Sequence, residues 1–330
     1  MNLITTFSST LFSICYNTYS EMMESVPDSE KDIHWWEASS KSRVLLTPKL
    51  KDLLSYRKKL LKLKQKDLAK ILNIKTSRMS LYENYRRCPT VSIFLRWIKV
   101  LSISKEVIEK YIILFNAPKF KFKLDKFPYP EVPEHAEIIA HTLFDGTLAR
   151  GRSFYYETHN PIEQNGFRKL IEKCNMSDAI YSSFSSGVKM YGLSSVASNL
   201  LINHYNFQKD RLSEKIMDYT LNDKKWINAV LRACFIDEGS AGKEKLRDNI
   251  LIACSLRNET LANQILRLLR KDHSCRLCID TRRNEFTVLL HNRSLTGFYN
   301  DALKHLPDDY YKKINIQRMI NRLQPTKFKW

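Results

Sequence analysis

Two acidic residues, Asp145 and Glu238, occupy the same place in two similar segments of this chain. The segments span 138–146 and 231–239, and in each the acid is followed by a final glycine. Both are apolar around almost the whole helical circumference, which is typical of helices buried between two halves of a domain. Because glycine favours a left-handed helix cap, we expect each carboxylate to lie at the carboxyl end of a helix.

A carboxylate at that end of a helix faces the negative end of the helix dipole, which disfavours it by about 0.3–1 kcal/mol. Two acids in this position therefore need a nearby cation. A divalent metal ion shared between Asp145 and Glu238, at the ends of two packed helices, would supply it. Such an ion can activate water and stabilise the oxygen displaced from a phosphodiester. The alternative is a pair of buried helices with ordinary capped ends.

The two segments resemble the twin motifs of the LAGLIDADG homing endonucleases. In that family the motif helices pack at the centre of the domain, and the strands form two saddle-shaped sheets over DNA. The resemblance covers roughly residues 134–323 and is specific at the two motifs. It implies a magnesium-dependent endonuclease that cuts both strands of a long DNA site, with Asp145 and Glu238 as catalytic metal ligands.

The pattern that follows each motif also repeats, with one order of strand, helix, hairpin and helix. In the first copy these elements are expected at 153–159, 162–174, 180–184 with 188–193, and 194–204. In the second copy they are expected at 249–257, 259–271, 275–280 with 285–291, and 294–303. We therefore predict an α+β fold with a pseudo-twofold domain of two αββαββα-like halves, about 134–208 and 221–323, which carry the saddle sheets.

The family also places basic or polar side chains near its cleavage centre, and Lys189 is the candidate here. Its strand neighbours Val188 and Met190 would occupy the opposite face, which leaves Lys189 and Tyr191 towards DNA. In the second half the nearest equivalents are residues at a hairpin tip, which we also expect to bind DNA: Arg282 and Arg283.

Strand alternation assigns further side chains to the two faces of each sheet. In the second half Phe286, Val288 and Leu290 should face the core, and Glu285, Thr287 and His291 should face outward. In the first half two sets remain open, because parity alone does not decide between them. The sets that could face DNA are Tyr155 with Glu157, or Phe154 with Tyr156 and Thr158.

Residues 63–84 resemble a helix-turn-helix of the Cro/repressor type. The apolar residues that would pack its two short helices are Leu68, Ala69, Leu72, Ile74, Met79 and Tyr82. Asn73 suits the left-handed turn between the helices. The expected DNA-binding residues are Gln65, Lys75, Thr76, Ser77 and Arg78, followed by Arg86. An amphipathic helix pair without a DNA-binding role is the alternative.

The chain departs from the motif pattern at two positions where the family packs its helices closely. These positions hold Phe144 and Asp237 instead of small residues. A phenylalanine would push the helices apart, and Asp237 adds a third acid beside Glu238. A shift of about an ångström costs a catalytic site much of its activity. A DNA-binding transcriptional regulator that has lost cleavage is therefore the alternative function.

Length and charge agree with a DNA-binding protein of several domains. The chain has 330 residues, with 54 Lys and Arg against 35 Asp and Glu and a net charge of +19. This charge favours double-stranded DNA as the partner. A solvated basic surface is the alternative, and a membrane surface is disfavoured because no basic stretch carries a large aromatic face.

The expected domain order has five parts. Residues 1–47 form a poorly ordered arm, 48–116 an all-α helix-turn-helix domain, 117–133 a basic linker with prolines, 134–323 the endonuclease domain, and 324–330 a tail. Two internal halves favour a monomer, although the helix-turn-helix could dimerise. The ends lack the residues that protein splicing needs, so we expect a free-standing protein and not an intein.

The seven cysteines are scattered and odd in number, which suits a reducing cytoplasm. A structural zinc site at His273, Cys275 and Cys278 is conceivable, but cysteines in an alternating apolar strand usually act as small hydrophobic residues. We expect His141, inside the first motif, to be an interface histidine. No window has the composition of a membrane span or a secretory leader.

Overall fold

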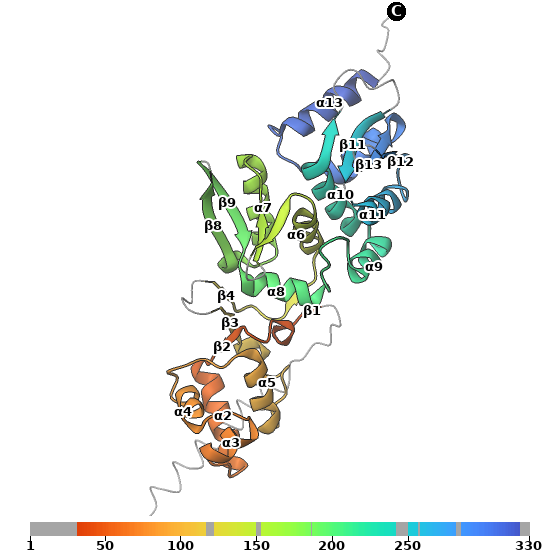
Figure 1. Cartoon of the computed structure of the whole chain (residues 1–330). Coiled ribbons are helices and arrows are strands. Elements are labelled where there is room, and N and C mark those ends of the chain that lie inside the picture. Colours follow the sequence, from red (N-terminus) through yellow and green to blue (C-terminus); the bar gives the residue numbers. More distant parts are fainter. Residues whose placement is uncertain are drawn as a thin grey trace, which may run out of the picture. The chain divides into compact units, whose positions relative to one another are not determined.

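The structure is a computed structural model that describes residues 32–116, 122–149, 153–185, 187–241, 250–256, 258–281 and 285–323. The chain divides into two compact units. The first comprises Met1–Glu131 and Ser194–Asn203, and the second comprises Val132–Leu193 and His204–Trp330. Figure 1 labels their elements. In the part of the chain that is described, no helix has the length and apolar character that crossing a membrane requires.

The first unit contains the predicted helix-turn-helix. Its helices are α2 (Pro48–Leu60), α3 (Gln65–Ile71), α4 (Thr76–Glu83) and α5 (Val91–Val100). The turn between α3 and α4 has Asn73 at φ 52°, the left-handed conformation that the sequence predicted. Five of the six predicted packing residues are buried, namely Leu68, Ala69, Leu72, Met79 and Tyr82, whereas Ile74 is only half-buried. The predicted α3–turn–α4 arrangement is therefore confirmed.

Short strands accompany these helices. They are β1 (Asp32–Ile33), β2 (Arg43–Leu45), β3 (Ile113–Phe115), β4 (Lys123–Leu124) and β5 (Tyr129–Pro130), with 3-10 turns η1 (Trp35–Glu37) and η2 (Glu109–Tyr111). One sheet has the order β2-β3-β4, and β1 pairs with β5.

Two expectations about order along the chain were therefore wrong in part. Residues 32–47 are not a loose arm, because Ile33, Trp35 and Val44 are fully buried. The described end of the linker is likewise structured, with Leu124 and Tyr129 buried in paired strands. The polar composition of these segments concealed a few large apolar side chains, whose burial is enough to fix the backbone. Residues 1–31 and 324–330 lie outside the described residues.

The second unit repeats one set of elements. The first copy has α6 (Pro133–Leu143), β6 (Gly146–Ala149), β7 (Ser153–Tyr156), α7 (Pro161–Lys173), η3 (Ser177–Ala179), β8 (Ile180–Ser185) and β9 (Val188–Leu193). Helix α8 (Ser195–His204) follows in the chain, and all but its last residue is assigned to the first unit. The second has α10 (Lys224–Glu238), β10 (Gly239–Ala241), β11 (Ile250–Leu256), α11 (Glu259–Leu269), β12 (Cys275–Asp280), β13 (Glu285–His291), η4 (Asn292–Ser294), α12 (Leu295–Phe298) and η5 (Tyr299–Leu303). Helix α9 (Glu214–Asn222) precedes α10, and α13 (Tyr311–Leu323) ends the described chain.

The two antiparallel sheets have matching strand orders, β6-β7-β9-β8 and β10-β11-β13-β12. The predicted α+β fold with αββαββα order is therefore confirmed. Strands β6 and β10, directly after the motifs, fit this order, but no residue range was predicted for them. Figure 1 shows α6 and α10 between the sheets, and these helices pack against each other.

Each sheet has one face against a helix, which settles the choice that parity left open. Phe154 and Tyr156 are buried, and the Tyr156 ring lies 5.0 Å from that of Phe167 on α7. Tyr155 therefore lies on the opposite, open face. In the second half Val288 and Leu290 are buried as predicted, in the sheet that α11 covers.

The glycine that follows each motif acid is explained by close packing rather than by a left-handed cap. Gly239 has φ −76° and ψ 136°, so the expected left-handed conformation is wrong there. A Cβ atom on Gly239 would lie 2.4 Å from the Phe235 carbonyl oxygen, and one on Gly146 would lie 2.6 Å from the Thr142 Cα. At both positions any side chain would collide with the preceding helical turn.

Candidate active site

The two motif acids lie at the carboxyl ends of the packed helices α6 and α10, but their surroundings differ. Asp145 follows α6 and is only partly buried, whereas Glu238 is the last residue of α10 and is half-buried. Glu238 lines an open pocket of about 480 Å³ together with Leu143 and Phe144 from the first motif. Asp145 instead has polar and charged neighbours, with Asp237 first among them.

The carboxyl of Asp145 is held in a region of excess negative charge. Partial burial of this group and the negative charge of Asp237 raise its pKa to about 6, against the opposing charge of Lys312. The ionised form of Asp145 is therefore disfavoured in the folded protein. A cation next to it would be bound more strongly than a cation next to an isolated carboxylate.

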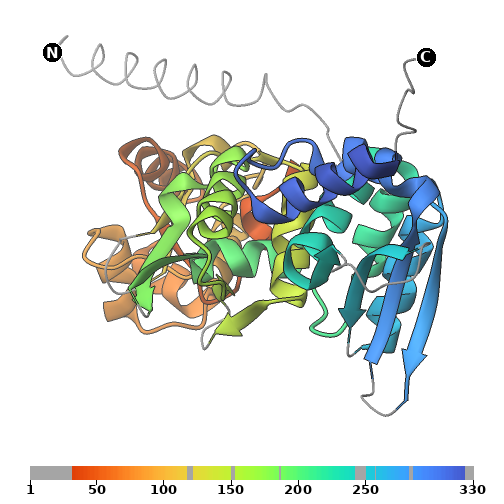
Figure 2. The same cartoon turned by 90° about the horizontal axis from the view of Figure 1, so that it is seen from above.

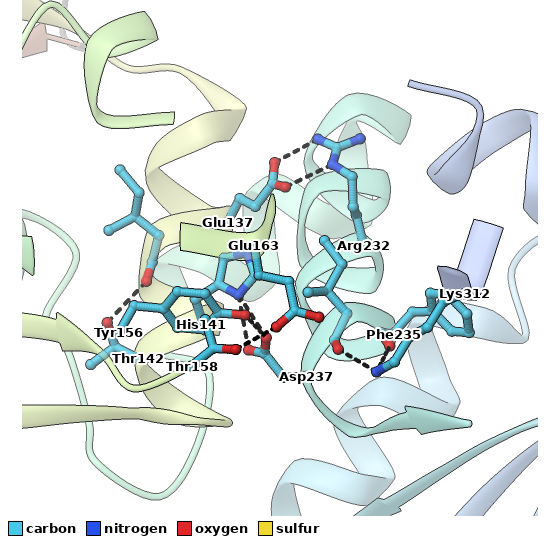
Figure 3. A network of polar contacts seen from close by, with 12 residues as sticks. Glu137, His141, Thr142, Tyr156, Thr158, Glu163, Arg232, Phe235, Asp237 and Lys312 are labelled. Atoms are coloured by element: carbon cyan, nitrogen blue, oxygen red, sulfur yellow. Dashed lines mark hydrogen bonds and ion pairs between the residues drawn. The ribbon is translucent and has the colours of Figure 1, made fainter. Parts of the chain in front are cut away.

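Asp237 lies inside the unit and bridges the two halves (Figure 3). Its Oδ1 accepts a 2.6 Å hydrogen bond from the Tyr156 hydroxyl, and its Oδ2 lies 2.9 Å from His141 Nδ1. Burial alone would lower the pKa of His141, but the charge of Asp237 and its hydrogen bond raise it. Burial raises the pKa of Asp237. The pair thus holds a proton, and His141 is an interface histidine, as the sequence predicted.

Glu163, which lies on α7, is a further acid in this region. Its carboxylate accepts hydrogen bonds from Thr158 Oγ1 at 2.5 Å and from the Tyr310 hydroxyl at 2.8 Å. Its negative charge contributes to the raised pKa values of Asp145 and Asp237. Together, Asp145, Glu163 and Asp237 form what we call the acid cluster. No pattern in the sequence pointed to Glu163, because it lies on a helix that was predicted only from its periodicity.

A further cation, Lys312, comes from α13, the dark blue helix in Figure 2, and reaches the end of α10. Lys312 is buried, and its ammonium donates to the carbonyl oxygens of Phe235, at 3.4 Å, and Ile236. These carbonyls belong to the last turn of α10, where a positive charge also offsets the helix dipole.

Sequence reasoning missed Lys312, although a signal was present. In α13 Ile316 and Ile320 are buried four residues apart, and Lys312 lies in phase with them. A lysine on the apolar stripe of a helix is rarely buried without a partner, and it therefore indicates a buried acceptor.

A second ion pair crosses the same helix interface. Arg232 donates from Nε to Glu137 Oε1 at 2.7 Å and from Nη2 to Oε2 at 2.5 Å, in a bidentate arrangement. Ala140 and Ala233 are fully buried, as the close helix packing requires. The interface therefore combines small residues with two ion pairs, and pairs of this kind fix one register of the helices.

Lys189 is exposed on β9. Its Nζ lies 5.3 Å from the ring centre of Tyr191, and that ring also lies 5.9 Å from the guanidinium carbon of Arg168 on α7. Met190 is buried, as expected, and the Gln164 amide of α7 donates to its sulfur at 3.4 Å. The role of Lys189 stays a prediction.

In the first unit, Lys75, Thr76, Ser77, Arg78 and Arg86 are all exposed, as DNA contacts require. Gln65 is different. Its Nε2 donates to Glu83 Oε2 at 2.6 Å, while Lys58 donates to Glu83 Oε1 at 2.6 Å. This network joins α2, α3 and α4, so Gln65 holds α4 in place. Arg282 and Arg283 lie outside the described residues.

Among residues 32–323, as far as they are described, no group of three or more His, Cys, Asp and Glu side chains could hold a metal ion alone. The zinc alternative is therefore not supported, and Cys275 instead directs its thiol to the Leu266 carbonyl oxygen at 3.9 Å.

Comparison with known protein families gives one match, which lies within the first unit. A helix-turn-helix family model matches residues 53–108. No protein of curated function matches the chain in sequence.

Three solved structures share part of the chain trace. I-DmoI in complex with DNA and Mn is 14% identical, with a TM-score of 0.36, and covers 52% of this chain and 96% of its own. The homing endonuclease I-WcaI bound to its DNA recognition sequence is 13% identical, with a TM-score of 0.38 and coverages of 55% and 85%. Full-length DUF199/WhiA from Thermatoga maritima is 12% identical, with a TM-score of 0.40 and coverages of 58% and 60%. These likenesses concern the chain trace alone and assign no residue a role.

Proposed function

We propose that this protein is a sequence-specific DNA endonuclease of the LAGLIDADG homing type, whose helix-turn-helix unit adds to target binding. The main support is the unfavourable environment of the Asp145 carboxylate. Its carboxyl is crowded by Asp237 at a helix end, and its pKa is raised to about 6. A protein that only binds DNA gains nothing from an acid held at this cost, whereas a cation-dependent nuclease needs one.

Magnesium suits the donors that are present. It takes oxygen ligands, keeps several waters, and is usually bound by one or two carboxylates together with substrate phosphates. Asp145 and Glu238 supply carboxylate oxygens at the ends of the two motif helices. Since DNA phosphates complete such a site, a cluster of three protein ligands is not required. When bound, the ion would activate water and stabilise the displaced oxygen.

The remaining residues would bind and orient DNA. Exposed Lys75 and Arg78 at the start of α4 are suited to the major groove and its phosphates. On the open faces of the sheets, Tyr155, Thr287 and Arg276 are placed to contact a duplex. The net charge of +19 favours association with any DNA, and these side chains would add specificity. Because both halves belong to one chain, we propose that a monomer acts.

The decisive experiment is to capture genomic fragments with the purified protein in calcium, exchange calcium for magnesium, and map fragment ends at single-base resolution. New ends at a fixed offset within bound sites support the endonuclease. Asp145→Asn and Glu238→Gln should keep binding and lose cutting. Asp218→Asn, an exposed acid on α9, is the matched control and should cut like the wild type.

A second candidate function, a cleavage-free transcriptional regulator, is favoured by one observation. The carboxylate of Asp237, next to Glu238 in the chain, is bonded to His141 and Tyr156, and Phe144 lines the pocket of Glu238. The surroundings of the two motif acids, Asp145 and Glu238, therefore differ. Fragments that remain intact in magnesium, while binding stays site-specific, would decide for the regulator.

A further inference from the structure

The first unit contains a pocket that has no part in the function proposed above. It lies between α2, the end of α4 and α5, which Figure 1 labels. On the α2 side its lining includes Lys51, Leu54 and Lys58, which share one face of that helix because they are three or four residues apart. The pocket volume is about 170 Å³. A cavity of about 150 Å³ is large enough for benzene, so one small organic molecule fits here.

The wall that comes from α5 has a hydrogen-bond donor without an acceptor. Trp97 lines the pocket and is 3% exposed, and its indole Nε1 is buried without a partner in the part of the chain that is described. Buried N–H groups are nearly always paired, because an unpaired one has lost its hydrogen bond to water. The indole N–H only donates, so the missing partner is an acceptor. The pocket beside the ring is a place from which a ligand can supply it.

The charges around the pocket leave a positive excess. Lys58 donates to Glu83 Oε1 at 2.6 Å, and Gln65 donates to Oε2 of the same carboxylate. The charge of Glu83 is therefore neutralised. The Nζ atom of Lys51 lies 3.1 Å from the ring centre of Tyr85, and Lys51 forms no ion pair with a carboxylate of the described residues. One positive charge remains, which favours an acceptor that is a monoanion.

Tyr85, which lies just after α4, has a backbone conformation that is unusual for a large residue. Its φ is 60°, in the left-handed region, and the residue is 48% exposed. Such a conformation costs energy and is found most often at ligand-binding and switch sites. Together with Leu54 and Trp97, the Tyr85 ring gives the pocket apolar walls beside its polar groups. These walls suit a compact apolar body attached to the anion.

We propose that this pocket binds a small organic carboxylate, which accepts hydrogen bonds from Trp97 and Lys51 while its apolar body lies against the Tyr85 ring. A carboxylate has two oxygens and can accept from both donors at once. Bound there, it would also compete with Glu83 for Lys58 and weaken the contact that joins α2 to α4. Ligand binding should therefore lower the DNA affinity of the helix-turn-helix, and DNA should lower the ligand affinity by the same factor.

The test is to add sodium benzoate or sodium isovalerate to the full-length protein and follow the tryptophan indole N–H signals by NMR. The chain has five tryptophans, and the signal of Trp97 is identified by its loss in Trp97→Phe. Both acids should shift this signal until it saturates. Benzamide, the uncharged analogue of benzoate, should bind about 10-fold more weakly, because it lacks the charge that Lys51 attracts.

Lys51→Met should weaken benzoate binding by about 10-fold. Lys51 is only half-buried, so this variant does not depend on repacking the core. Lys59→Met is the matched control, since Lys59 is exposed on the same helix outside the pocket, and it should bind benzoate like the wild type. A Trp97 signal that neither acid shifts overturns the proposal. Benzoate binding that Lys51→Met leaves unchanged also overturns it.

The effect on DNA is measured separately with the captured site, and this part rests on the proposed DNA binding. Benzoate should weaken DNA binding by the wild type more than by Lys51→Met, relative to sodium chloride at the same concentration. A saturating Trp97 shift with unchanged DNA affinity overturns the coupling between the pocket and α4. A protein that binds no DNA refutes the proposed function, and the Trp97 signal still decides whether the pocket binds the acid.

Discussion

His141 of the first motif helix and Asp237 of the second form a buried ion pair, with Nδ1 2.9 Å from Oδ2. Their side chains are 4% and 0% exposed. The pair joins the two halves of the unit at the helix interface, beside the acids of the candidate site. Asp237 therefore has a structural role that its place next to Glu238 in the sequence concealed.

Breaking this pair from one side should be strongly destabilising. His141→Leu would leave the Asp237 carboxylate buried with only the Tyr156 hydroxyl as a partner. Removing one member of a buried ion pair typically costs about 3–5 kcal/mol. Urea unfolding should show a loss of that size, and the double variant His141→Leu, Asp237→Ala should recover most of it. A loss below about 1 kcal/mol in the single variant would contradict a charged buried pair.

Asp145 should make the folded protein less stable as the pH rises. Its pKa in the fold, about 6, is above the usual 3.8, because partial burial and Asp237 disfavour its charge. A raised carboxyl pKa adds stability while the group is protonated, and this contribution is lost as the pH rises through about 6.

Asp145→Asn removes the titrating group and should therefore raise the melting temperature above pH 6. The difference from the wild type should shrink as the pH falls towards 3.8, where both forms are uncharged. Thermal melts across this range measure it, with Asp218→Asn as the exposed control. A melting temperature of Asp145→Asn equal to that of the wild type at high pH would show that the fold does not disfavour the charge of this carboxyl.

The repeated elements of the second unit could be predicted because each has a strong local pattern. Strand β9 (Val188–Leu193) and strand β13 (Glu285–His291) coincide with the predicted segments, since alternation and turn residues mark both ends. Strands β6 and β10 were missed because they are short and begin at the glycine of the motif. Their pairing depends on strands β7 and β11, which is a tertiary effect.

The candidate site could be predicted only where the motif repeats. Asp145 and Glu238 were found from their matching positions, but Glu163 and Lys312 come from other helices, α7 and α13. Their relation to the motif helices arises from packing, which no spacing in the sequence encodes.

Arg78 should contribute to specific DNA recognition, since it is exposed on the first turns of α4. Arg78→Ala should weaken binding to the captured site by about 1–3 kcal/mol and affect random DNA less, if the side chain reads a base edge. Fluorescence anisotropy with both DNAs measures the difference, and Lys70→Ala, exposed on α3, is the control. Equal losses on both DNAs would make Arg78 a phosphate contact.

Gln65 should affect binding through the position of α4 rather than through a contact of its own. Gln65→Ala removes the donor to Glu83 Oε2 and leaves that carboxylate with Lys58. A lost hydrogen bond to a charged group costs about 1.5–3 kcal/mol. Thermal denaturation should therefore report a lower stability of the helix-turn-helix, with weaker binding to both DNAs. An unchanged melting temperature with a loss confined to the specific site would make Gln65 a direct reader.

The two motif glycines should tolerate no side chain, because the backbone passes too close. A Cβ on Gly239 would meet the Phe235 carbonyl oxygen at 2.4 Å, and one on Gly146 the Thr142 Cα at 2.6 Å. Backbone atoms cannot swing aside, so Gly239→Ala and Gly146→Ala should each cost about 3 kcal/mol or more and shift the neighbouring acid.

Gly166 on α7 provides the matched control for these substitutions. Nothing lies within 4 Å of a Cβ at this position, and the residue is inside a helix. Gly166→Ala should therefore stabilise the protein by about 0.5–1 kcal/mol. Urea unfolding of the three variants separates the two cases. If Gly239→Ala were as stable as Gly166→Ala, close packing at the turn between α10 and β10 would not be the reason for glycine at position 239. The position of Glu238 beside this turn would then need another explanation.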